Sequence, residues 1–356
     1  MRALLLVLAL AVLFSVPCAA VDTEELKYAL PEDAAGLLQE VDFTDTDPQR
    51  GFTALFQQAV QVLRKGLKAS VTSAFFMTAV CMLVSLLQGF AKSAGVNLPA
   101  RAGELSGATA ILSLALGQNG ALLELCRQAV SNLDRFTKVL CGVFAAASAA
   151  AGKPVSAAAT AGAAMLFSDL LFQLTLKVFL PGVTLYLLLL YGSVICGNGT
   201  LRQAAGVEKW AVTAFFRVFL TVYFAYLTFT GLVSGSADAA AVKTAQTLSS
   251  TVPLVGSVIA GASETILTGG ALLRSSVGLA GFLGAAAICL VPFVQGLCHL
   301  LVFRVLSVLA AGFSEGGCKT MLDGLWSAYA MLIGMLAACC AVQFITIAVS
   351  MLVTGT

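Results

Sequence analysis

The stretch that decides the fold is Ala69–Ala91, with the sequence ASVTSAFFMTAVCMLVSLLQGFA, which stands between Lys68 and Lys92. It carries no charged residue. About 20 consecutive apolar residues are enough for a helix to cross the hydrocarbon core of a bilayer, so this stretch predicts a transmembrane helix. Five further spans are predicted for the same reason: Leu105–Leu123, Val178–Cys196, Ala211–Val233, Ser275–Phe303 and Leu325–Val353.

Composition supports a membrane protein. Of the 356 residues, 59% are hydrophobic and 11% are charged, against about 45–50% and 25% in ordinary globular domains. The net charge of +2 comes from scattered residues, which argues against a nucleic-acid partner. The ten cysteines mostly lie in apolar stretches, which argues against a disulfide scaffold. We therefore predict an all-α, polytopic transmembrane helical bundle of about six full spans, with two proline-broken re-entrant or short hairpins.

The N-terminal part predicts three segments before the transmembrane domain of 69–356. Residues 1–20 have the charge, apolar run and small-residue cleavage site of a signal peptide, although an uncleaved anchor helix is the alternative. Residues 21–50 contain nine of the eighteen acidic residues and predict a solvated segment outside the cytoplasm. Residues 51–68 show the 3.6-residue period of an amphipathic helix, expected either to lie on the membrane or to pack on a partner.

Two stretches are polar and small for membrane-embedded sequence. Val139–Ser168 is rich in alanine, glycine and serine and is interrupted by Lys153-Pro154, while Thr244–Ser263 has Pro253 at its centre. Both predict re-entrant hairpins or broken helices, which are tolerated where protein or water surrounds them. In both, proline is followed at the same distance by Ala-Gly-Ala, which is either a weak internal repeat of the kind seen at transporter sites or a coincidence of composition.

Charges beside these stretches are candidates for a polar path. Asp169 and Lys177 follow the first hairpin, and Asp169 and Glu264 are expected to take part either in a polar cavity or in structural ion pairs. Arg217 is expected to snorkel to the headgroups. The full candidate set for the path is Lys153, Pro154, Asp169, Pro253, Gly256, Glu264 and Arg274.

Closely spaced glycines predict tight helix packing. Gly231 and Gly235 have GxxxG spacing, and Gly278, Gly281 and Gly284 recur every three residues. Such faces let helix backbones approach in lipid, either between copies of the chain or within one bundle.

No catalytic or cofactor motif is predicted. His299 is the only histidine, which argues against histidine-based metal sites and most acid–base schemes. The stretch Gly312–Thr320 superficially resembles a P-loop, but a cysteine precedes its lysine and no strand is expected before it. We expect no enzyme activity, no metal and no cofactor.

The region of the second hairpin resembles the stage III sporulation protein AE family. The resemblance is carried by Lys243-Thr244-Ala245, Val252-Pro253-Leu254-Val255-Gly256, Ser263-Glu264-Thr265 and Leu272-Leu273-Arg274-Ser275-Ser276-Val277-Gly278. It extends from about Gly51 to the C-terminus. The chain departs from the family pattern in having arginine rather than lysine at Arg274 and in lacking an aspartate shortly before Glu264, which weakens a claim that a charged cluster there is essential.

The resemblance implies a component of the complex that joins mother cell and forespore during engulfment, located in the mother-cell membrane around the forespore. It implies partners from the same operon, including ring-forming subunits, and, indirectly, the forespore's stage II sporulation protein Q. The leading hypothesis is a non-enzymatic component of this channel or feeding apparatus. The alternatives are a stand-alone ion-coupled transporter and a purely structural scaffold. With a cleaved signal and six spans, the C-terminus would lie outside the cytoplasm.

Overall fold

The structure is a computed structural model that describes residues 48–94, 100–150, 154–197, 199–229, 276–310, 312 and 316–355. These residues are helical almost throughout and include no strand. The elements are α4 (Pro48–Ser93), α5 (Ala100–Ala150), α6 (Pro154–Leu174), the π-helical turn η1 (Thr175–Phe179), α7 (Leu180–Cys196), α8 (Gly199–Phe229), α11 (Ser276–Ala310) and α12 (Gly317–Gly355). The signal peptide, the acidic segment and the second hairpin fall outside the described residues.

The helical membrane fold predicted from the sequence is confirmed. Five helical stretches are long and apolar enough to cross a membrane: Leu55–Phe90, Leu105–Phe144, Ala164–Cys196, Ala280–Ala310 and Gly317–Val349. The sixth predicted span belongs to α8, whose 31 residues reach about 46 Å but which is not among these five.

The first predicted hairpin takes a different form. α5 continues without interruption through Gly117–Gly120 to Ala150, and α6 begins at Pro154. Alanine favours helix, and proline is tolerated in the first turn of a helix, where its missing N–H costs nothing. A helix therefore starts at Pro154, as the proline indicates. The two helices on either side are long, in place of the short hairpin predicted over Val139–Ser168.

Pro181 lies within the predicted span Val178–Cys196 and does not interrupt it. It lies in the first turn of α7, directly after the π-helical turn. Inside a helix a proline ring clashes with the carbonyl four residues earlier, here that of Lys177. The wider π turn accommodates this, so α6, η1 and α7 form a continuous stretch of which Ala164–Cys196 could span the membrane.

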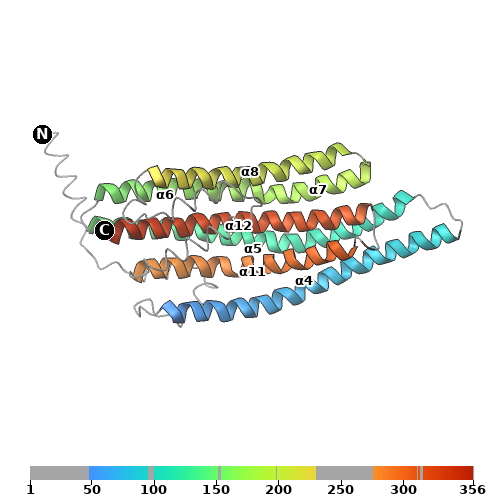
Figure 1. Cartoon of the computed structure of the whole chain (residues 1–356), viewed down its shortest axis with the longest axis horizontal. Coiled ribbons are helices and arrows are strands. Elements are labelled where there is room, and N and C mark those ends of the chain that lie inside the picture. Colours follow the sequence, from blue (N-terminus) through green and yellow to red (C-terminus); the bar gives the residue numbers. More distant parts are fainter. Residues whose placement is uncertain are drawn as a thin grey trace.

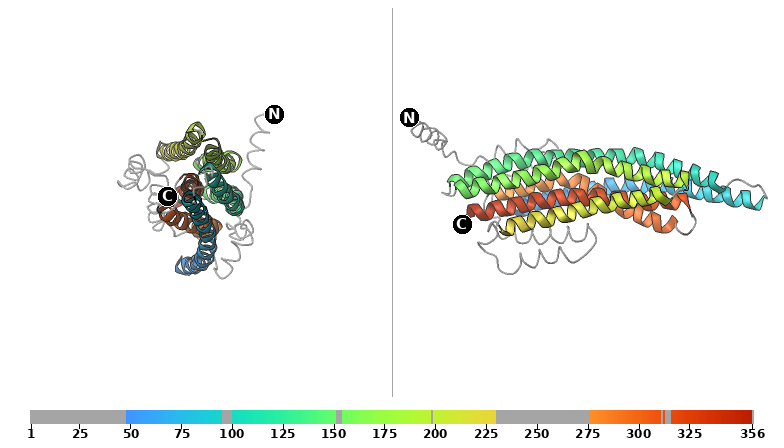
Figure 2. Two further views of the ribbon diagram at one scale, coloured as in Figure 1. Left: turned by 90° about the vertical axis from the view of Figure 1, so that its right-hand side faces the viewer. Right: turned by 90° about the horizontal axis from the view of Figure 1, so that it is seen from above.

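The helices run alternately up and down the bundle, and α12 lies among the others (Figures 1 and 2). Most of the apolar part of α12 is buried, packed mainly against α11, α5 and α7. The start of α4 and the C-terminal end of α12 lie at the same end of the bundle, while α4 and α5 extend beyond the other helices at the opposite end (Figure 1). The amphipathic segment 51–68 is the first part of α4, where Gly66 packs against Gln295 and Cys298 of α11.

Candidate functional site

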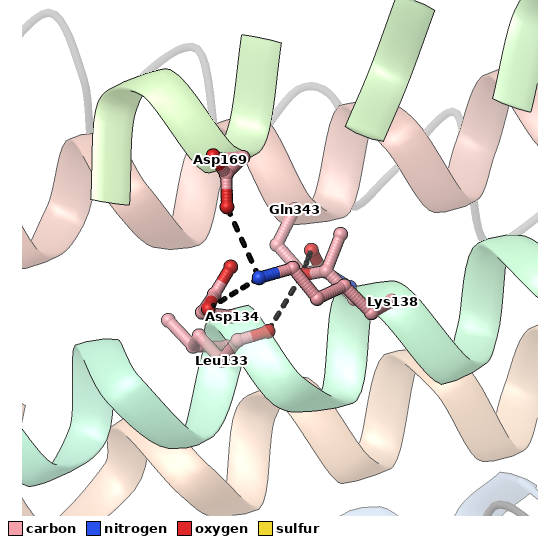
Figure 3. A network of polar contacts seen from close by, with 6 residues as sticks. Leu133, Asp134, Lys138, Asp169 and Gln343 are labelled. Atoms are coloured by element: carbon pink, nitrogen blue, oxygen red, sulfur yellow. Dashed lines mark hydrogen bonds and ion pairs between the residues drawn. The ribbon is translucent and has the colours of Figure 1, made fainter. Parts of the chain in front are cut away.

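Asp169 lies in a three-residue ion cluster between α5 and α6 (Figure 3). The Lys138 ammonium is 2.8 Å from a carboxylate oxygen of Asp134 and 3.0 Å from one of Asp169. Asp134 precedes Lys138 by four residues, so the two share a face of α5, whereas Asp169 comes from the neighbouring helix. Lys177, eight residues after Asp169, is exposed in the π turn. The acid predicted for the polar path is thus neutralised by a lysine of α5.

Next to the ion cluster, two buried polar pairs connect α12 to its neighbours, and we call these four residues the polar layer. The hydroxyl oxygen of Thr137 in α5 lies 2.5 Å from the amide oxygen of Gln343 in α12 and shares its proton between this oxygen and the carbonyl of Leu133. One helical turn further, the hydroxyl groups of Tyr223 in α8 and Thr346 in α12 are 2.8 Å apart. All four side chains are at most 1% exposed. Because Thr137 is adjacent to Lys138, the polar layer and the ion cluster meet on α5.

Several buried polar atoms lack a hydrogen-bond partner within the described part of the chain. They are the amide nitrogen of Gln343, the hydroxyl groups of Ser168 and Tyr329, one carboxyl oxygen of Glu208, and both amide atoms of Asn119. An unsatisfied buried polar group costs about 1–3 kcal/mol, and such groups usually indicate a bound water, another ligand or a functional role. Gln343 therefore belongs to the polar layer, and its amide nitrogen has no hydrogen-bond partner within the described residues.

A second polar site surrounds His299 of α11, at a level further along the neighbouring α12. The Nδ1 of His299 is 2.8 Å from the carbonyl oxygen of Gln295 and 3.1 Å from the hydroxyl of Ser70 in α4, and its ring lies against Tyr329 of α12. Between Tyr329 and Gln343, α12 contains only apolar residues and glycine, 330–342, and nearly all are buried. These cover about 20 Å of helix, so the described bundle has no continuous row of polar side chains along α12.

The structure places only some of the predicted site residues. Pro154 and Asp169 are described, as are Gly278, Gly281 and Gly284, which are buried in α11. A β-carbon on Gly281 would be 2.9 Å from Leu140 of α5, so this glycine packs within the bundle. Arg217 is exposed. The remaining predicted residues lie outside the described part: Lys153, Gly231, Gly235, Pro253, Gly256, Glu264 and Arg274.

Several site residues were missed from the sequence. Asp134 and Lys138 lie between the predicted span Leu105–Leu123 and the predicted hairpin Val139–Ser168, whereas the structure places them inside α5. Gln343 carried a usable signal, because it is the one amide side chain within the predicted span Leu325–Val353. Thr137 carried none, since a threonine hydroxyl in an apolar helix usually bonds to its own backbone. Tyr223 carried none because its partner Thr346 belongs to another helix.

The P-loop-like stretch supplies the first turn of α12. α12 begins at Gly317, and the buried Cys318 side chain packs against Gly107 of α5. In the described residues no group of three or more histidine, cysteine or acidic side chains is arranged to hold a metal ion.

The comparisons with known proteins agree on one family. The sequence profile of the family described as stage III sporulation protein AE matches residues 37–354. The chain is also similar to the stage III sporulation protein AE of Bacillus subtilis (strain 168), with 22% identity over 298 residues, which cover 83% of this chain and 73% of the relative. No solved structure gives a significant match.

Proposed function

Since the chain belongs to the stage III sporulation protein AE family, which gives it a role in sporulation, we propose that it is a non-enzymatic membrane component of the channel complex between mother cell and forespore. It would reside, as a multi-pass protein, in the mother-cell membrane that surrounds the forespore. Its partners would be other membrane proteins of the same operon, including ring-forming subunits, and indirectly the forespore's stage II sporulation protein Q.

The observation that carries this proposal is the polar layer around α12. Polar side chains are expensive in an apolar helical bundle and are usually kept for a function. Here they join three helices within one helical turn of α12. Thr137 of α5 contacts Gln343, and Tyr223 of α8 bonds to Thr346. Their hydrogen bonds can be exchanged for bonds to water or to a passing polar solute at little cost.

In this proposal the described bundle is the closed state. The apolar residues 330–342 of α12 fill the space between the polar layer and His299, and close packing leaves no room for a solute there. Opening would need a shift of α12 relative to α5 and α8. Contact with partner subunits would supply the free energy for that shift, because a conformational change requires a partner that binds the two states differently.

The test is a pull-down of the tagged chain from membranes of sporulating cells, with identification of the co-purifying proteins. We expect the ring-forming operon partners to be recovered with the wild-type chain. Recovery of the chain alone would contradict a role in the complex. A companion strain with Asp134→Asn and Asp169→Asn then tests the site: normal spore yield and normal assembly would show that the ion cluster is not needed.

A second candidate function is a stand-alone ion-coupled transporter. The observation that favours it is the ion cluster of Asp134, Lys138 and Asp169 beside a buried amide, because ionisable groups at membrane depth often carry coupling ions. This alternative expects solute uptake by vesicles that contain only this protein. The channel proposal expects none without its partners.

A further inference from the structure

Two cations from different helices surround the indole of Trp326. Trp326 belongs to α12, and the guanidinium of Arg304 in α11 lies 4.4 Å from the centre of its ring. The ammonium of Lys209 in α8 lies 5.9 Å from the same ring. The separation of the two cations is thus at most the sum of these distances. Cations within about 6 Å of an indole are attracted by its electron-rich face, so Trp326 brings cations from two different helices to one ring.

The two cations retain hydrogen-bonding capacity for a ligand. Lys209 donates one bond, to the hydroxyl of Ser327 at 3.1 Å, and an ammonium has three donors. Arg304 is exposed, and within the described part of the chain neither residue forms an ion pair. The site therefore presents unneutralised positive charge to its surroundings.

The nearby acids do not cancel this charge. Asp323 is held by a hydrogen bond from the hydroxyl of Ser307 and forms no ion pair with Arg304 or Lys209 within the described part of the chain. Burial raises the pKa of Glu208, the residue before Lys209, which disfavours its negative form. Arg202 adds a further exposed cation one to two turns along α8. The positive charge thus exceeds the negative charge around Trp326.

The site lies near one end of several helices. Lys209 directly precedes the apolar part of α8, Arg304 stands six residues before the end of α11, and Trp326 stands nine residues after the start of α12. On α4, Ser70 contacts His299 of α11, near the point where Lys68 ends the amphipathic segment. Cations and tryptophan at the ends of apolar spans mark the headgroup region of a bilayer.

We propose that Lys209, Arg304 and Trp326 bind the headgroup phosphate of an anionic phospholipid. Basic pockets between transmembrane helices are a recognised mode of anionic lipid recognition, and guanidinium and phosphate match in geometry. The acyl chains lie along α11, where Leu301, Leu297 and Val294 precede Arg304 by three, seven and ten positions and so share its face. Leu301 is 63% exposed, which leaves apolar surface for an acyl chain.

The experiment measures lipid binding to the full chain purified in a non-ionic detergent, by native mass spectrometry during titration with phosphatidylglycerol, phosphatidylcholine or inorganic phosphate. We expect phosphatidylglycerol to bind about tenfold or more tightly than phosphatidylcholine. Removing one cation near an anionic headgroup costs about fivefold in affinity, so Lys209→Gln and Arg304→Gln each weaken binding by about that factor and the double variant by about thirtyfold. Inorganic phosphate is expected not to compete.

The control is Arg127→Gln, which removes an exposed cation that pairs with Glu124 at 3.1 Å on α5 and should leave phosphatidylglycerol binding unchanged. If the double variant does not fold, Arg304→Lys keeps the charge and should keep the lipid preference, whereas Arg304→Gln alone should reduce it. Equal binding of the two phospholipids, or unchanged binding by the double variant, would overturn the proposal. Effective competition by inorganic phosphate would assign the site to a soluble anion instead.

Discussion

Asp169 of α6 and Lys138 of α5 form a 3.0 Å ion pair across the junction of two long helices. Lys138 also binds Asp134, one turn earlier in its own helix, so one cation has two acidic partners. The side chains of Lys138 and Asp169 are 51% and 46% exposed, which lets them stay solvated or reach a headgroup. The arrangement explains how α5 and α6 can carry charges in otherwise apolar surroundings.

Because Lys138 has two acidic partners, removing both should lower the stability of the chain by more than the sum of the two single removals. Asp169→Asn leaves the pair with Asp134 and should lower the free energy of unfolding by less than about 1 kcal/mol, as for other exposed pairs. Asp134→Asn combined with Asp169→Asn leaves the half-exposed Lys138 without an acidic partner and should cost about 1 kcal/mol, the upper end for exposed pairs. Thermal unfolding in detergent measures both. Additive effects of the two single variants, with no extra loss in the double, would contradict a shared partner.

Gln343 allows stability and function to be separated. Gln343→Leu removes an amide nitrogen that lacks a partner, while Thr137 keeps its bond to the Leu133 carbonyl at 2.6 Å. Replacing a poorly satisfied buried polar group by an apolar one is usually neutral or stabilising, so the midpoint of unfolding should stay the same or rise. If the polar layer is the gate, spore yield should nevertheless fall.

The matched control for this prediction is Gln128→Leu, the same substitution at an exposed position of α5, which should sporulate normally. A stable Gln343→Leu chain with full spore yield would remove the polar layer from the mechanism. Loss of stability would instead indicate a structural role for the amide.

Gly281 tests the packing of α11 against α5. A β-carbon at this position would be 2.9 Å from a methyl group of Leu140, so Gly281→Ala should destabilise the bundle by about 1 kcal/mol and Gly281→Leu by more. Leu140→Ala should compensate part of the loss, which a double-mutant cycle measures. Gly142→Ala is the control, because no atom lies within 4 Å of the added carbon and alanine favours helix. No coupling between positions 281 and 140 would contradict the observed contact.

The sequence predicted the membrane class, because long uncharged stretches have few alternative explanations. It did not predict that α5 would continue past Glu124 and Lys138, because charges at the end of an apolar stretch normally mark the end of a span. Glu124 pairs with Arg127 on the same helix, and Lys138 pairs with Asp134 and with Asp169 of the neighbouring helix. The polar layer was equally hidden, since Thr137 and Gln343 come together only through the packing of α5 on α12.

Glu208 makes stability depend on pH. Burial raises the pKa of this carboxyl, so the folded chain holds the proton at pH values where the unfolded chain has released it. Stability is then greatest below the ordinary carboxyl pKa and falls as pH rises from there to the raised pKa. Unfolding midpoints measured from acid to neutral pH should show this decrease. Glu208→Gln should flatten it and raise stability at neutral pH, whereas Glu124→Gln on exposed α5 should not; an unchanged profile in Glu208→Gln would assign the slope to another group.

The direction of the helices predicts the membrane topology. The start of α4 and the C-terminal end of α12 lie at one end of the bundle, while the end of α4, the start of α5 and the adjoining ends of α7 and α8 lie at the other (Figure 1). A reporter that is active only outside the cytoplasm should therefore give opposite signals after Thr356 and after Ala94. An insertion at Gly197 should match the one at Ala94. If the N-terminal segment is exported as its signal-like sequence predicts, the C-terminal fusion is the active one, because an even number of passes returns the chain to the side on which it started. The same activity after Ala94 and after Thr356 would mean that an even number of passes separates these two positions, whereas the bundle requires an odd number.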